Sequence, residues 1–250
     1  MRFRFTAFGL HLAGSACVLT LILGGLYLGW YRWPGWYLTG VVRVLAIVAL
    51  VDLGLGPTLT FIVANPGKPR RVFARDVAVI VTVQLVALVY GAVTLWRGRP
   101  LYYAFSVDRL EMVQASDLDA PDIALGRREN PALAPHWYSL PRWISAPLPD
   151  DPQEAARIIQ GTVFGGHDVV QMPRYFRPWE QGRPKLREHL APVDQMKELT
   201  KSERQDLHAR MSRLGLASDE RNALILWGDI PRVVVIFDRR TLQIRSILEP

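Results

Sequence analysis

Three long stretches of the first 96 residues are almost free of charge. Residues 5–31 and 77–96 contain no formally charged side chain, and residues 44–64 contain only Asp52. A helix crosses a bilayer with about 20 apolar residues, whereas buried helices of soluble proteins rarely lack charges over such a length. We therefore predict three transmembrane helices within a membrane domain of residues 1–99.

The excess positive charge of the chain lies in this apolar part. The whole chain carries a net charge of +7, and residues 1–96, with eight basic and two acidic side chains, account for +6 of it. Short cytoplasmic loops are enriched in Lys and Arg. Arg2 and Arg4 precede the first stretch, and four basic residues lie between positions 68 and 75. We expect a bacterial inner-membrane protein with a cytoplasmic N-terminus and a periplasmic C-terminal domain, and no nucleic-acid partner, because that would require a basic face on the soluble part.

Asp52 is the only formal charge deep inside a predicted span. An ionisable group at that depth is costly and is a candidate functional residue. Pro57, which follows Gly56, should kink the helix and leave a carbonyl without its donor. Gln84 in the third span and Arg43 near the second are possible partners. Two interpretations stay open: Asp52 serves a function, or it is a structural residue that bonds a neighbouring helix or is protonated.

Residues 100–250 have the composition of a soluble domain, for which we predict a small α+β fold with antiparallel strands. Residues 101–113 are typical of a strand and residues 153–160 of a short helix. Thr200 and Glu203 form the pattern of a capping box, after which Leu207, Met211 and Leu214 share one apolar face. Three closing strands are expected at 223–227, 232–238 and 242–248. Segments 114–152 and 165–192 are predicted to be largely irregular.

Catalytic sequence motifs are missing from this chain. It contains no G-x-S-x-G, P-loop, G-x-G-x-x-G or H-E-x-x-H motif, and its single cysteine, Cys17, excludes an intrachain disulfide and a Cys-based metal site. We therefore predict no catalytic residue, metal or cofactor. The nearest alternative is His167 beside Asp168, which follow two glycines. A turn is the expected role of this segment, because neighbouring side chains of a strand point to opposite faces.

Several segments resemble the type IV pilin accessory proteins of the TfpX/TfpZ kind. The resemblance covers most of the chain and is most specific between Asp52 and Arg109. Its segments are 52–60 (DLGLGPTLT), 65–68 (NPGK), 76–91 with Gln84 and Tyr90, 99–109 (RPLYYAFSVDR) and, more loosely, 165–166 and 233–238. The resemblance implies a non-enzymatic inner-membrane protein that supports assembly or function of a cognate pilin.

Such a helper should offer contacts to its partner in the bilayer and in the periplasm. Helix association in lipid depends on close packing and interhelical hydrogen bonds. The candidate membrane contact residues are Asp52, Gly54, Gly56, Pro57 and Gln84. The other expected partner of this surface is membrane lipid.

The candidate periplasmic contact is an aromatic cluster formed by Tyr175, Phe176 and Trp179. Aromatic side chains are enriched at interface hot spots, but the same residues equally fit an ordinary core. Two other functions remain open besides the pilin accessory role. One is a membrane-anchored periplasmic enzyme that uses His167 and Asp168, and the other is a regulatory subunit of an envelope complex.

Overall fold

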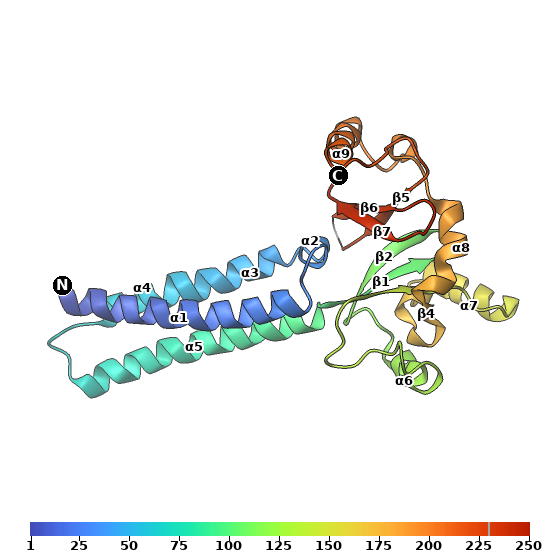
Figure 1. The fold of residues 1–250 in the computed structure, drawn as a ribbon. Helices are drawn as coiled ribbons and strands as arrows, with labels where there is room; N and C mark the ends of the chain where they lie inside the picture. Colours follow the sequence, from blue (N-terminus) through green and yellow to red (C-terminus); the bar gives the residue numbers. More distant parts are fainter. Residues whose placement is uncertain (230) are drawn as a thin grey trace. The chain divides into compact units, whose positions relative to one another are not determined.

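The computed structural model describes residues 1–229 and 231–250, which form two compact units (Figure 1). The membrane unit comprises Met1–Arg32 and Gly40–Gly98, and the soluble unit comprises Trp33–Thr39 and Arg99–Pro250. The connection Trp33–Thr39 is therefore part of the soluble unit, although it lies between the first two apolar stretches.

The membrane unit contains three helices that are long and apolar enough to cross a bilayer, as predicted. They cover Arg2–Gly29, Val42–Val63 and Arg70–Arg97. The first is α1 (Arg2–Gly29), the second consists of α3 (Val42–Ala49), η1 (Leu50–Leu55) and α4 (Gly56–Val63), and the third is α5 (Arg70–Arg97). α1 packs mainly against α4, and α4 in turn packs against α5.

Close packing and a few polar contacts hold the three helices together. A Cβ atom on Gly91 would lie 2.6 Å from Cγ2 of Val48, so the glycine allows α5 to approach α3 closely. The Tyr31 hydroxyl donates to the carbonyl of Leu95 at 2.7 Å, and Arg4 Nε donates to the carbonyl of Ala64 at 2.8 Å. These bonds satisfy carbonyl groups near helix ends, where intrahelical donors run out.

The soluble unit is built on a mixed seven-stranded sheet in the order β4-β3-β1-β2-β5-β6-β7. The strands are β1 (Pro100–Ser106), β2 (Arg109–Gln114), β3 (Arg142–Ser145), β4 (Arg177–Pro178), β5 (Ala223–Trp227), β6 (Arg232–Phe237) and β7 (Ile244–Leu248). β5, β6 and β7 form the antiparallel sheet end that the sequence predicts. The pairs β1–β3 and β2–β5 are parallel, so the sheet is not purely antiparallel.

The prediction of a single strand over 101–113 is wrong. The segment forms the antiparallel hairpin of β1 and β2, which turns at Val107 and Asp108. Val107 has a φ of +49°, a left-handed conformation that β-branched residues rarely adopt. The turn contains Asp108 but no glycine, and a valine occupies the left-handed position, so the turn signal in the sequence is weak.

Five helices of the described residues accompany the sheet. They are α2 (Gly35–Leu38), α6 (Ala120–Glu129), α7 (Pro152–Val163), α8 (Trp179–His189) and α9 (Lys201–Arg213), with single 3₁₀ turns at η2 (Val169–Gln171), η3 (Pro173–Tyr175) and η4 (Val193–Gln195). The expected helix at 153–160 is α7, and the capping box of Thr200 and Glu203 at the start of α9 is confirmed. The segments expected to be irregular contain α6, β3 and α8, which corrects that prediction.

β6 lies at the centre of the hydrophobic core. Its odd-numbered residues, such as Val233, belong to one buried cluster with Leu38, and its even-numbered residues, such as Val234, belong to a second cluster with Leu207 and Met211. A strand covered on both faces is continuously apolar, as β6 is. Leu214, expected on the same apolar face as Leu207, is exposed because α9 has already ended there.

The turn between β6 and β7 is held by one carboxylate. Asp238 accepts the backbone N–H of Thr241 at 2.9 Å and the guanidinium of Arg245 at 2.6 Å. Together with the Thr241 hydroxyl, these donors hold the pKa of Asp238 well below its ordinary value.

Candidate functional site

The second membrane helix contains a wide π-helical turn, Leu50–Leu55, just before Gly56 and Pro57. The N–H of Gly56 bonds to the carbonyl of Val51, five residues earlier. In that pattern the carbonyl of Asp52 would receive the N–H of residue 57, but proline has none. The local sequence thus leaves the Asp52 carbonyl without a donor from its own helix. Such turns are frequent at functional sites.

Gln84 of α5 supplies the missing donor. Its Nε2 atom donates to the Asp52 carbonyl at 3.1 Å and lies 3.5 Å from Oδ1 of the Asp52 side chain. A Cβ atom on Gly56 would lie 2.0 Å from Nε2 of Gln84, so only glycine leaves room for this amide. Asp52 and Gln84 are both buried. The second and third membrane helices are therefore joined by a polar contact that depends on Gly56.

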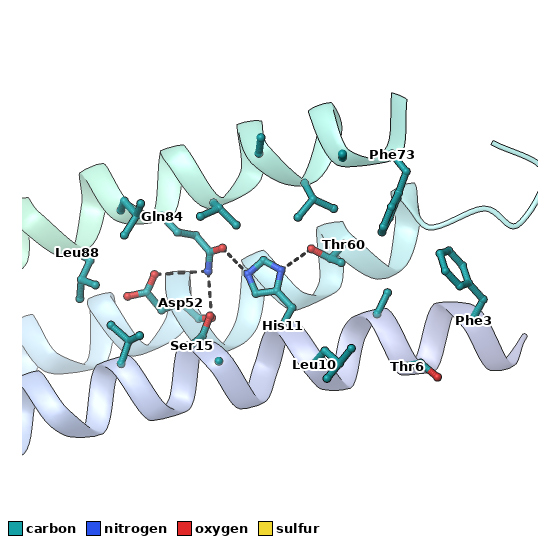
Figure 2. Close-up of a pocket in the computed structure, with 18 residues that line it drawn as sticks. Phe3, Thr6, Leu10, His11, Ser15, Asp52, Thr60, Phe73, Gln84 and Leu88 are labelled. Carbon is teal, nitrogen blue, oxygen red and sulfur yellow. Dashed lines mark hydrogen bonds between the residues drawn. The ribbon is translucent and has the colours of Figure 1, made fainter. Parts of the chain in front are cut away.

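His11 of α1 extends this contact to the first membrane helix. Its Nε2 atom lies 2.7 Å from Oε1 of Gln84, and its Nδ1 atom lies 2.6 Å from the Thr60 hydroxyl (Figure 2). Because Oε1 of Gln84 can only accept a hydrogen bond, Nε2 of His11 carries the proton and is the donor. With a neutral imidazole, the Thr60 hydroxyl then donates to Nδ1, and one directed series of bonds runs from Thr60 through His11 and Gln84 to Asp52.

The four side chains Asp52, Gln84, His11 and Thr60, here called the polar cluster, lie at one side of a groove between α1 and α5. The groove has a volume of about 800 Å³, and its lining is mostly apolar. The Oδ2 atom of Asp52 is buried and has no hydrogen-bond partner within residues 1–229 and 231–250. The cluster therefore retains one unused acceptor.

The membrane candidates proposed from the sequence play different parts in this arrangement. Asp52, Gly56 and Gln84 meet at one point, and Pro57 creates the free carbonyl. Gly54 has no comparable role, because a Cβ atom there would make only an ordinary contact of 3.5 Å with Leu50. His11 was missed, since a search for formal charges passes over a neutral histidine. Its position as an ionisable group inside a charge-free span was the available signal.

The aromatic cluster at Tyr175, Phe176 and Trp179 lies in the interior of the soluble unit. Phe176 is fully buried and meets the ring of Tyr102 at a centroid distance of 4.8 Å, and Tyr175 is also buried. Trp179 is half-buried and stacks on Phe237 at 6.3 Å. Of the two interpretations left open by the sequence, this placement favours core packing. Burial also raises the pKa of the Tyr175 hydroxyl, which donates to Glu154 at 2.6 Å.

His167 and Asp168 do not form a catalytic pair. The Asp168 carboxylate caps the turn η2 in a capping box with Gln171 and lies 3.2 Å from a guanidinium nitrogen of Arg109. The His167 side chain is half exposed, and its Nδ1 atom lies 3.8 Å from the carboxylate of Asp119. The arrangement is that of a capped turn, which is the role the sequence predicts for this segment.

Comparison with known proteins finds relatives among bacterial fimbrial assembly proteins. The chain is 26% identical over 225 residues to the fimbrial assembly protein of serogroup I from Dichelobacter nodosus, a match that covers 88% of this chain and 85% of the relative. The serogroup E1 protein of the same organism is 25% identical with the same coverage. The protein of serogroups C1 and C2 is 30% identical over 119 residues, which cover 47% of this chain and 91% of the relative.

No family model matches the chain, and no solved structure matches it. The similarity to the serogroup I protein nevertheless extends over both units. The match covers 88% of the chain, and each unit is far larger than the part that is not aligned. The chain therefore belongs to the family of the Dichelobacter nodosus fimbrial assembly proteins.

Proposed function

We propose that this protein is a non-enzymatic inner-membrane accessory factor that supports assembly of a cognate type IV pilin, as the TfpX/TfpZ proteins do. It acts by contacts with the pilin in the bilayer and in the periplasm. The observation that carries the proposal is the family relationship, which extends over both the membrane unit and the soluble unit.

The proposed orientation has two lines of support. Trp33–Thr39 packs within the soluble unit, where Leu38 is fully buried and its carbonyl accepts the N–H of Asp229 at 3.1 Å. The first connection therefore lies on the same side of the membrane as the C-terminal domain. The second connection, on the other side, carries Lys68 and the basic start of α5 at Arg70, which is typical of a cytoplasmic loop.

The orientation is tested with reporter fusions. Alkaline phosphatase fused after Pro250 should be active, because this enzyme folds only outside the cytoplasm. The same reporter inserted at Lys68 should be inactive. Activity at Lys68 with silence at Pro250 would invert the orientation and remove the periplasmic contact from the proposal.

The accessory role is tested by deletion and complementation. Cells without the gene should lose surface fimbriae, and the wild-type chain should restore them. His167→Ala should restore them as well, because His167 has no catalytic arrangement around it. Loss of fimbriae by several orders of magnitude with His167→Ala at an unchanged protein level would instead favour the periplasmic enzyme, since removal of an essential base is that costly.

A further inference from the structure

The groove between α1 and α5 is open along the membrane unit. α1 and α5 pack against α4 far more than against each other, and this leaves a groove between them. One wall includes Ala7, Leu10 and Gly14 of α1, and the other includes Ala78, Val81 and Leu85 of α5. The lining extends over 16 residues of each helix, from Phe3 to Val18 and from Phe73 to Leu88. At about 1.5 Å per residue this is about 22 Å, or roughly four helical turns.

The polar cluster places one unsatisfied hydrogen-bond acceptor in this apolar groove. Asp52 contributes to the lining, its side chain is 5% exposed, and its Oδ2 atom has no hydrogen-bond partner among the described residues. A buried acceptor without a donor is costly, and in lipid no water is available to satisfy it. Gln84 and His11 have already committed their donors to other atoms. Among the described residues no donor reaches this atom, and a donor from a bound partner would satisfy it.

Gly14 is a small residue on the α1 wall, and the other glycines of α1 have the same open space around them among the described residues. A Cβ atom built there meets nothing within 4 Å, in contrast to Gly56 and Gly91, which contact neighbouring helices of the same chain. On the α5 wall, Ala74 and Ala78 are four residues apart, the spacing at which small residues let two membrane helices approach closely. Both walls thus present small side chains toward the open groove.

We propose that the groove binds one transmembrane helix of the cognate pilin, and that this helix donates a hydrogen bond to Oδ2 of Asp52. The inference rests on the proposed function and adds the place and the chemistry of the contact. A lipid acyl chain could fill the apolar volume but has no donor for the carboxylate. A helix with a small-residue face and one hydroxyl, amide or cationic group at this depth satisfies both features.

The test uses a photoreactive amino acid in the full-length protein, expressed in its own bacterium with its pilin. Benzophenone side chains are placed at the groove positions Val81 and Leu85. Matched controls are Val83 and Val86, which are exposed on the same helix but do not line the groove. The groove positions should crosslink the transmembrane segment of the pilin, at a yield at least fivefold above that of the controls.

A second variant pair tests the same groove without a probe. Gly14→Leu fills the groove, whereas Gly9→Leu adds the same side chain to α1 outside the lining, and both positions have open space around them. Gly14→Leu should lower crosslinking and pilin recovery severalfold at an unchanged protein level, and Gly9→Leu should not.

Three results would overturn the inference: equal pilin crosslinking at all four positions, crosslinking of the groove only to lipid or to a second copy, or normal pilin crosslinking with Gly14→Leu. If the pilin co-purifies with the chain but never crosslinks in the groove, the inference fails and the proposed function stands. If the pilin does not co-purify at all, the proposed function itself fails.

Discussion

Gly56→Ala should disrupt the polar cluster, because the added Cβ atom would lie 2.0 Å from Nε2 of Gln84. The amide must move away and lose its bonds to the Asp52 carbonyl and to His11, at 3.1 and 2.7 Å. Interhelical hydrogen bonds in membranes contribute about 0.6 to 2 kcal/mol each. Two such bonds amount to about 1 to 4 kcal/mol of the unfolding free energy.

Gly54→Ala is the matched control, since a Cβ atom there makes only an ordinary contact of 3.5 Å. Both substitutions replace a glycine by alanine in the same membrane helix, but only Gly56 precedes a proline, which disfavours a helical alanine at that position. The double-mutant cycle below separates this local cost from the contact with Gln84. The assay is reversible unfolding of the full chain in mixed detergent micelles, followed by far-UV circular dichroism. Gly56→Ala should be less stable than Gly54→Ala by about 1 to 4 kcal/mol.

A double-mutant cycle sharpens this test. Gln84→Ala removes the same hydrogen bonds, so adding Gly56→Ala to it should cost little further stability. Equal stability of Gly56→Ala and Gly54→Ala, or full additivity of Gly56→Ala with Gln84→Ala, would refute the packing of Gln84 against Gly56.

Three further predictions concern other parts of the molecule. Asp52→Asn keeps the shape but replaces one of the two acceptor oxygens with a donor, so it should weaken pilin association less than Asp52→Leu, which removes both oxygens and should cost about 1 kcal/mol in a pull-down titration; failure of Asn together with full activity of Glu would mean that a carboxyl group is required. Phe176→Ala should destabilise the soluble unit by about 3 to 5 kcal/mol in urea unfolding, whereas Phe164→Ala, at a side chain 88% exposed, should change it by less than about 0.5 kcal/mol; similar effects of the two would contradict the placement of Phe176 in the core. Because the folded-state pKa of Asp238 lies below its ordinary value of 3.8, its contribution is present above that pH and disappears as the pH falls through the folded-state value. The lower urea midpoint of Asp238→Asn at pH 7 should therefore approach that of the wild type below about pH 4, and a difference that persists unchanged in acid would rule out the carboxylate as its cause.

The sequence was most informative where one physical requirement dominates. Twenty apolar residues without a charge have few alternatives to a membrane span, so the three long helices could be predicted directly. The same logic identified Asp52 and its partner Gln84, because an acid in lipid requires a polar neighbour. The other suggested partner, Arg43, makes no hydrogen bond with Asp52 in the described part of the chain. The terminal strands could be predicted because their apolar residues are bounded by clear turn residues.

The sequence was less informative where tertiary contacts decide the outcome. Tyr175 and Phe176 have the composition of an interface or of a core, and only the fold places Phe176 against Tyr102. β3 has four residues and pairs in parallel with β1 from a distant part of the chain, so its local pattern is weak. The start of α6 did carry a signal, a proline in its first turn after Asp119, which the high content of Pro and Asp in the surrounding segment obscured.

The proposed function requires that this protein contacts a pilin in the membrane. This contact is measured by affinity purification of the full-length chain from detergent-solubilised membranes of its own bacterium, with quantitative mass spectrometry. We expect the cognate pilin to be recovered with the wild-type chain and to be strongly reduced with Gly14→Leu. Two results together would contradict the proposed function: no pilin is recovered with an abundant, folded wild-type chain, and a strain that lacks this protein forms normal fimbriae.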